Sequence, residues 1–157
     1  MDLGESTWEA GSLYGCEVTR ADFSGATLTG IAIERCAITG SRFTDVRLKD
    51  VLFEGCRFDY ATFHRVAAVG SVALTDCALS NGEWPSCRLP RIVLWSCDLA
   101  GLEWDACHLD GADLRGSRLH GVRTPLDNLR GVTLGEDQLP DFTQLTVAAL
   151  HLTVRSD

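Results

Sequence analysis

Seven cysteines are the residues of this chain best suited to chemistry, because thiols bind metals, form disulfides and act as nucleophiles. No two of them have the CxxC spacing of zinc and redox sites, and the four histidines are scattered. The cysteines are Cys16, Cys36, Cys56, Cys77, Cys87, Cys97 and Cys107. Their recurrence at intervals of 20 or 21 residues indicates places in a repeated structure, where cysteine is a small buried apolar residue. We therefore expect neither a metal site nor a cofactor.

The sequence also lacks the motifs of common enzymes. It contains no P-loop, GxGxxG, GxSxG or HExxH pattern. Its aspartates recur with the repeat described below, so pairs of carboxylates do not indicate acid–base catalysis. We expect a protein that is not an enzyme.

The charge and the N-terminus limit the possible partners. The chain has 22 acidic and 14 basic residues, for a net charge of -8, which disfavours direct nucleic-acid binding and suits solubility or a basic protein partner. No segment approaches the ~20 apolar residues of a membrane span. The acidic start, Met1–Glu5, lacks the basic and apolar regions of a signal peptide. We expect a cytoplasmic protein with no membrane partner.

One residue in every five is apolar along most of the chain. The first thirteen such positions run in steps of five from Leu3 to Phe63, without exception. One extra residue then enters within residues 66–68, near Ala67, and eleven more positions follow from Val69 to Leu119. A period of five fits neither an α-helix nor a flat strand, because the apolar residues would scatter around either element. It fits a solenoid that turns a corner every five residues and keeps one side chain facing the axis.

Two further positions of the repeat agree with a solenoid. Small or apolar residues, including all seven cysteines, stand two places before the apolar centres. Glycine is frequent two places after them, where a corner needs unusual backbone dihedrals. The segments Ala21-Asp22-Phe23-Ser24-Gly25 and Ala112-Asp113-Leu114-Arg115-Gly116 resemble the consensus of the pentapeptide-repeat family.

This resemblance implies an all-β protein, a right-handed quadrilateral parallel β-helix in which four repeats make one coil. Residues 1–134 would form this pentapeptide-repeat solenoid of about six to seven coils, a rod about 30 Å long at the strand spacing of ~4.8 Å. Residues 135–157 would form a C-terminal cap and dimerisation segment. Residues 20 apart should stack, which places an aromatic core stack on one side. The stack consists of Phe23, Phe43, Phe63, Trp84 and Trp104.

Outward residues sort into faces with different character. The face over the aromatic stack, called the acidic face, carries three arginines against seven carboxylates. These are Asp2, Glu5, Asp22, Asp45, Glu83, Glu103 and Asp105. The following face, the basic face, carries Arg47, Lys49, Arg88, Arg91 and Arg130. The third face shows an apolar strip of Ala32, Leu52, Ala73, Val93 and Trp95, which is either a contact site or a scatter of single apolar residues. The acidic face is either a docking surface or ordinary solvated surface.

The repeat ends after Leu119, and Thr124-Pro125 breaks it. Acidic residues, an early proline and an apolar pattern after residue 135 predict one or two short helices. A solenoid needs its open end covered. The apolar residues of this segment should cover the last coil, pair with a second copy, or do both. They are Leu139, Phe142, Leu145, Leu150 and Leu152.

The best-understood members of the resembled family are dimeric, acidic rods that mimic DNA and protect DNA gyrase and topoisomerase IV from quinolones or toxins. The resemblance therefore implies a homodimer, joined through its C-terminal segment, whose acidic face binds gyrase or topoisomerase IV. The alternative is a protein-interaction scaffold of the same fold with no topoisomerase target.

Overall fold

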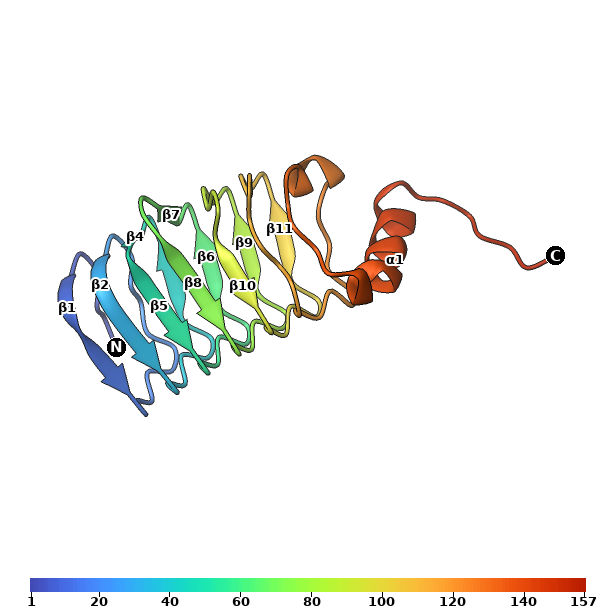
Figure 1. The fold of residues 1–157 in the computed structure, drawn as a ribbon. Coiled ribbons are helices and arrows are strands. Elements are labelled where there is room, and N and C mark those ends of the chain that lie inside the picture. Colours follow the sequence, from blue (N-terminus) through green and yellow to red (C-terminus); the bar gives the residue numbers. More distant parts are fainter.

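The chain winds into a rod of stacked coils (Figure 1), described by a computed structural model that covers residues 1–157. The strands are β1 (Thr7–Tyr14), β2 (Thr27–Glu34), β3 (Arg42–Thr44), β4 (Arg47–Lys49), β5 (Val51–Glu54), β6 (Thr62–His64), β7 (Ala67–Ala68), β8 (Val72–Thr75), β9 (Glu83–Pro85), β10 (Val93–Trp95) and β11 (Glu103–Asp105). One sheet has the order β10-β8-β5-β2-β4-β7 with β1 on β2, and the other has the order β11-β9-β6-β3. All the pairings are parallel, and the predicted parallel β-helix is confirmed.

Stacked residues are 20 apart until the middle of the rod and 21 apart across one corner. Ala67 pairs with Arg47, 20 residues before it, whereas Val72 pairs with Val51, 21 residues before it. The extra residue therefore lies in the corner after Ala68. The prediction that Val69 resumes the inward positions is wrong: Ala68 stacks on Leu48, and Val69 is 58% exposed. A corner accommodates an additional residue without breaking the ladder of hydrogen bonds, whereas a position within β7 would break it.

The core is a single apolar column built from the inward positions of every coil. The rings of Phe23, Phe43 and Phe63 stack in parallel, with centroids 4.6 and 4.7 Å apart, close to the spacing of neighbouring strands. Trp84 and Trp104 continue the same column with tilted rings. The aromatic stack therefore repeats with the coil, and one ring follows another along the axis.

The cysteines are free and, apart from the half-buried Cys16, buried. Each of the six buried thiols lies near a backbone carbonyl. The Sγ atoms of Cys56 and Cys97 donate to Ile33 O at 3.2 Å and Leu74 O at 3.3 Å, each 23 residues earlier. Ser117 holds the next place in this column and donates to Leu94 O in the same way. The column is thus more than small apolar filling, because one side-chain donor per coil bonds the coil before it.

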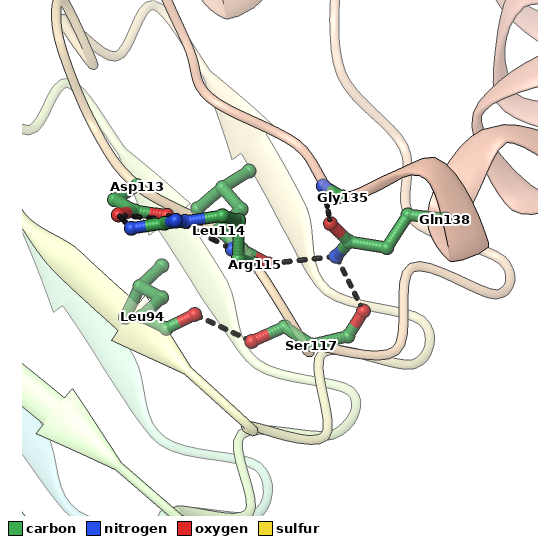
Figure 2. Close-up of polar contacts among 7 residues, drawn as sticks. All are labelled: Leu94, Asp113, Leu114, Arg115, Ser117, Gly135 and Gln138. Atoms are coloured by element: carbon green, nitrogen blue, oxygen red, sulfur yellow. Dashed lines mark hydrogen bonds and ion pairs between the residues drawn. The ribbon is translucent and has the colours of Figure 1, made fainter.

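The C-terminal segment closes the end of the rod. It contains two short 3-10 helices, η1 (Leu126–Leu129) and η2 (Glu136–Gln138), followed by α1 (Leu139–Ala149). Figure 2 shows Gln138 inserted at the last coil, where its Nε2 donates to Leu114 O and Ser117 O, both at 2.7 Å. Its Oε1 accepts from the Gly135 N–H, also at 2.7 Å. This buried side chain satisfies carbonyls that a further coil would otherwise bond. No helix of the structure is long and apolar enough to cross a membrane.

Candidate protein-docking surfaces

The acidic face runs up the side of the rod formed by β3, β6, β9 and β11. Strand alternation turns Phe43 and Trp104 into the core and leaves their neighbours outside. Glu83 and Glu103 are paired in register, as are Asp2 and Asp22. The seven carboxylates predicted for this face therefore do lie along one side, and with its three arginines the face has a net charge of -4.

Ion pairs between successive coils neutralise part of this charge. Arg65 Nε lies 2.6 Å from Asp45 Oδ1, and Arg42 lies 4.0 Å from Asp22. Arg123 pairs with Glu103. In each case the arginine stands 20 residues after its partner, directly above it in the ladder. Hydrogen bonding from Arg65 lowers the pKa of Asp45, so this carboxyl stays charged in acid as well as at neutral pH.

Two aspartates of the acidic face also have a local structural role. Asp22 Oδ1 accepts the Ser24 N–H at 2.9 Å and the Ser24 hydroxyl, and these hydrogen bonds lower its pKa. Asp2 Oδ1 accepts the Gly4 N–H at 2.9 Å in the same way. Such bonds stabilise the turn that follows each repeat centre. Only Glu5, Glu83 and Asp105 have neither an ion pair nor a turn bond, and these three are the carboxylates most available to a partner.

The third face is hollowed beside the apolar strip. A groove of about 900 Å³ crosses successive coils, and its lining includes Ala32, Leu52, Ala73 and Val93. Trp95 lies beyond it, 44% exposed, with the Arg115 guanidinium 5.7 Å from its ring centroid. Arg115 also pairs with Asp113 through two hydrogen bonds, which lower the Asp113 pKa to about 2. The sequence indicated the strip but not the groove, because the hollow depends on which corners lack side chains.

The C-terminal residues divide between covering the core and facing solvent. Leu145 is buried and Phe142 is half-buried, and both line a small apolar cavity of about 100 Å³ above Trp104. Leu139, Leu150 and Leu152 are each more than half exposed. A second hollow lies on the outer side of α1, lined partly by Val147 and Leu152. The segment therefore caps the rod with one set of side chains and leaves another set uncovered.

The sequence analysis missed Gln138, the residue that closes the ladder. The signal was present, since Gln138 lies 21 residues after Ser117 and so continues the column of Cys56, Cys77 and Cys97. Its donation to Leu114 O repeats the bond that Ser117 makes to Leu94 O (Figure 2). No group of three or more histidine, cysteine, aspartate or glutamate side chains is arranged to hold a metal ion.

Comparisons with known proteins agree with this architecture. Two models of pentapeptide repeats match residues 13–78 and 87–123. HetL, a pentapeptide repeat protein involved in heterocyst differentiation regulation from the cyanobacterium Nostoc sp. strain PCC 7120, is 18% identical with a TM-score of 0.51, over 83% of this chain and 73% of HetL. A trypsin-treated variant of QnrB1, a plasmid-mediated fluoroquinolone resistance protein, is 16% identical with a TM-score of 0.49, over 96% of this chain and 100% of that one. A search of curated proteins gives no match. Identities this low show a shared fold alone.

Proposed function

The chain belongs to the pentapeptide-repeat family, and from that premise we propose that it acts by binding another protein rather than by catalysis. The specific proposal is that the acidic face competes with DNA for the basic groove of DNA gyrase or topoisomerase IV in the cytoplasm. The observation that supports it is the alignment of seven carboxylates along one side of a straight rod. Charges arranged in this way steer a basic surface toward the rod, and the attraction weakens as salt is added.

The density of charge limits how closely one rod imitates DNA. Duplex DNA carries one phosphate per ~1.7 Å, or about 17 over the ~30 Å of this rod. The acidic face has a net charge of -4 over the same length. Mimicry therefore requires a longer charged surface, which a homodimer would supply. We propose that the dimer forms through Leu139, Leu150 and Leu152, the apolar residues that the cap leaves exposed.

A gyrase supercoiling assay with the purified chain tests the proposal. We expect inhibition of supercoiling, or relief from a quinolone or toxin, at micromolar protein and low salt. The variant Glu5→Gln/Glu83→Gln/Asp105→Asn removes the three freely available carboxylates and should abolish the effect. A matched control, Glu9→Gln/Glu17→Gln/Asp59→Asn, removes as many charges from other faces and should retain it. No effect of the natural chain on gyrase or topoisomerase IV, with no complex at low salt, would end the proposal. An equal loss in both variants would reduce it to an effect of net charge.

The dimer has its own measurement. Light scattering should give a dimer for the natural chain and a monomer for Leu150→Gln/Leu152→Gln, which leaves the buried Leu145 and Gln138 unchanged. A dimer that persists in this variant would contradict the C-terminal interface.

A protein-interaction scaffold without a topoisomerase target is the second candidate. The cross-coil ion pairs and turn bonds favour it, because they engage four of the seven carboxylates within the rod itself. A scaffold would leave supercoiling unchanged and would bind its partner through a different face.

A further inference from the structure

The groove on the third face follows the long axis of the rod. It crosses β2, β5, β8 and β10, which lie side by side along the length of the molecule (Figure 1). Gly30 and Gly70 form its corner edge and have no side chain to fill the hollow. Ala32 and Ala73 form its floor with short side chains. The corner with the extra residue, 69–71, borders the same groove, so the break in the repeat falls within this hollow.

A row of carboxylates flanks the groove on the side away from that corner. Glu34 and Glu54 are direct partners in the pairing of β2 with β5, and neither has an ion-pair partner. Asp76 follows them at the next coil and together with them lines a second, smaller hollow. Like charges stacked at the strand spacing of ~4.8 Å repel each other.

Other stacked positions of this rod are arranged differently. Arg42 stands above Asp22, Arg65 above Asp45, and Arg118 above Asp98, so that a cation follows an anion. The row formed by Glu34, Glu54 and Asp76 lacks such compensation. A cationic partner lying along the third face would supply it.

We propose that this groove binds an amphipathic helix of a partner protein. The apolar side of the helix would fill the groove over Ala32, Leu52, Ala73 and Val93, and its lysine or arginine residues would face Glu34, Glu54 and Asp76. Exposed Trp95, next to Val93 on the same face, extends the apolar contact at one end. This is the helix-in-groove mode of recognition, in which area comes from the apolar stripe and orientation comes from the flanking charges.

The spacing of the coils favours a helix over an extended peptide. Coils follow each other at ~4.8 Å, whereas the turns of a helix follow at ~5.4 Å and same-side residues of a strand at ~6.7 Å. Over the three steps from Ala32 to Val93 the helix stays within about 2 Å of register. A second copy of this chain fits poorly, because two concave grooves facing each other leave the space between them unfilled.

Two synthetic peptides provide the probe. Each is a helix-forming peptide of about 16 residues with one stripe of leucines, and they differ only in carrying lysine or glutamate on one flank of that stripe. Fluorescence anisotropy with the full chain at low salt should show at least about tenfold tighter binding of the lysine peptide, and added salt should narrow the difference. Equal affinities, or no binding of either peptide, would overturn the proposal.

Variants on the rod locate the binding. Ala32→Gln/Ala73→Gln places larger polar side chains on the groove floor and should weaken the lysine peptide by about tenfold or more. Glu34→Gln/Glu54→Gln should leave the groove open and remove most of the preference for lysine. The control Glu17→Gln/Asp59→Asn removes equal charge from another face and should bind as the natural chain does. Circular dichroism and the melting temperature establish that each variant is folded.

Two outcomes contradict the occupant. Equal loss of binding in the control would show a general attraction to an acidic protein rather than a site. If the natural chain self-associates and Ala32→Gln/Ala73→Gln alone abolishes this in sedimentation, the groove holds a second copy. The inference does not rest on the proposed gyrase target: the groove variants leave the acidic face intact, so a failed peptide assay and a failed supercoiling assay are separate results.

Discussion

Replacing Gln138 by leucine should destabilise the C-terminal end of the rod. Gln138 is 4% exposed and makes three hydrogen bonds of 2.7 Å, two as donor to Leu114 O and Ser117 O and one as acceptor from Gly135 N. Leucine has a similar volume but leaves these three backbone groups without a partner. Each such group costs about 1–3 kcal/mol when buried. Because water reaches the end of the rod more easily than its middle, we expect a total loss of about 2–4 kcal/mol.

The assay is urea unfolding followed by tryptophan fluorescence, since Trp104 lies beneath the cap and reports on it directly. A solenoid unfolds from its ends, so the loss should appear as an early transition of the last coil rather than a uniform shift. Gln144→Leu on the exposed side of α1 is the matched control and should unfold as the natural chain does. Identical curves for Gln138→Leu and the natural chain would refute the assigned role of this residue.

A second substitution at the same place gives a pH signature. In Gln138→Glu a carboxylate would face two carbonyl oxygens in a buried site, which raises its pKa in the folded chain above the ordinary value of ~4.3. The folded state then binds the proton more tightly than the unfolded state. The variant should therefore be least destabilised below pH ~4.3 and lose stability as the pH rises through the folded pKa. A deficit that is the same at every pH would mean that Gln138 acts by shape alone.

Three other changes test the core and the surface. Phe43 is 2% exposed and stacked on both sides, so Phe43→Ala should cost about 3–5 kcal/mol in urea unfolding, and Phe43→Leu clearly less. Cys97→Ser should retain the donor to Leu74 O and cost less than about 1.5 kcal/mol, whereas the bulkier Cys97→Val should cost about 1–3 kcal/mol, and the reverse order would show that the thiol serves only as filling. The Asp113 pKa is lowered to about 2 by Arg115, so this pair contributes stability above pH ~3.9 that is lost as the pH falls toward 2. Asp113→Asn should therefore differ most from the natural chain above pH ~4, and urea midpoints measured across pH 2–7 will show whether the gap closes in acid.

The fold followed from the sequence because every inward side chain obeys one rule. A step of five residues locates the centres, and a step of 20 brings Phe23, Phe43 and Phe63 into one stack. The rule failed at Val69, where two alternatives were apolar and nothing in the local sequence distinguished them. Ala68 takes the inward place because its backbone stays in register with Leu48, and that is a property of the ladder rather than of side-chain hydropathy.

The surfaces were harder to predict because charge on a rod is shared between coils. Phase alone assigned seven carboxylates to the acidic face, and they do lie there. It did not reveal that Asp22 and Asp45 are held by arginines 20 residues later, or that Asp2 and Asp22 bond the turns. These interactions depend on side-chain reach as well as register. The groove was hidden for a similar reason, since it arises where Gly30 and Gly70 meet alanines of neighbouring coils.

The ion pairs suggest a way to separate the charges that build the rod from those that serve a partner. A carboxylate with an arginine directly above it stabilises the stack and is partly neutralised. One without such an arginine costs repulsion, which only binding would repay. By this criterion Glu34, Glu54 and Asp76 on the third face are as noteworthy as Glu5, Glu83 and Asp105 on the acidic face. The first three lie beside an apolar groove and the second three do not. A purely electrostatic partner should therefore choose the acidic face and dissociate steeply with salt, whereas a partner on the third face should retain the part of its affinity that apolar burial provides.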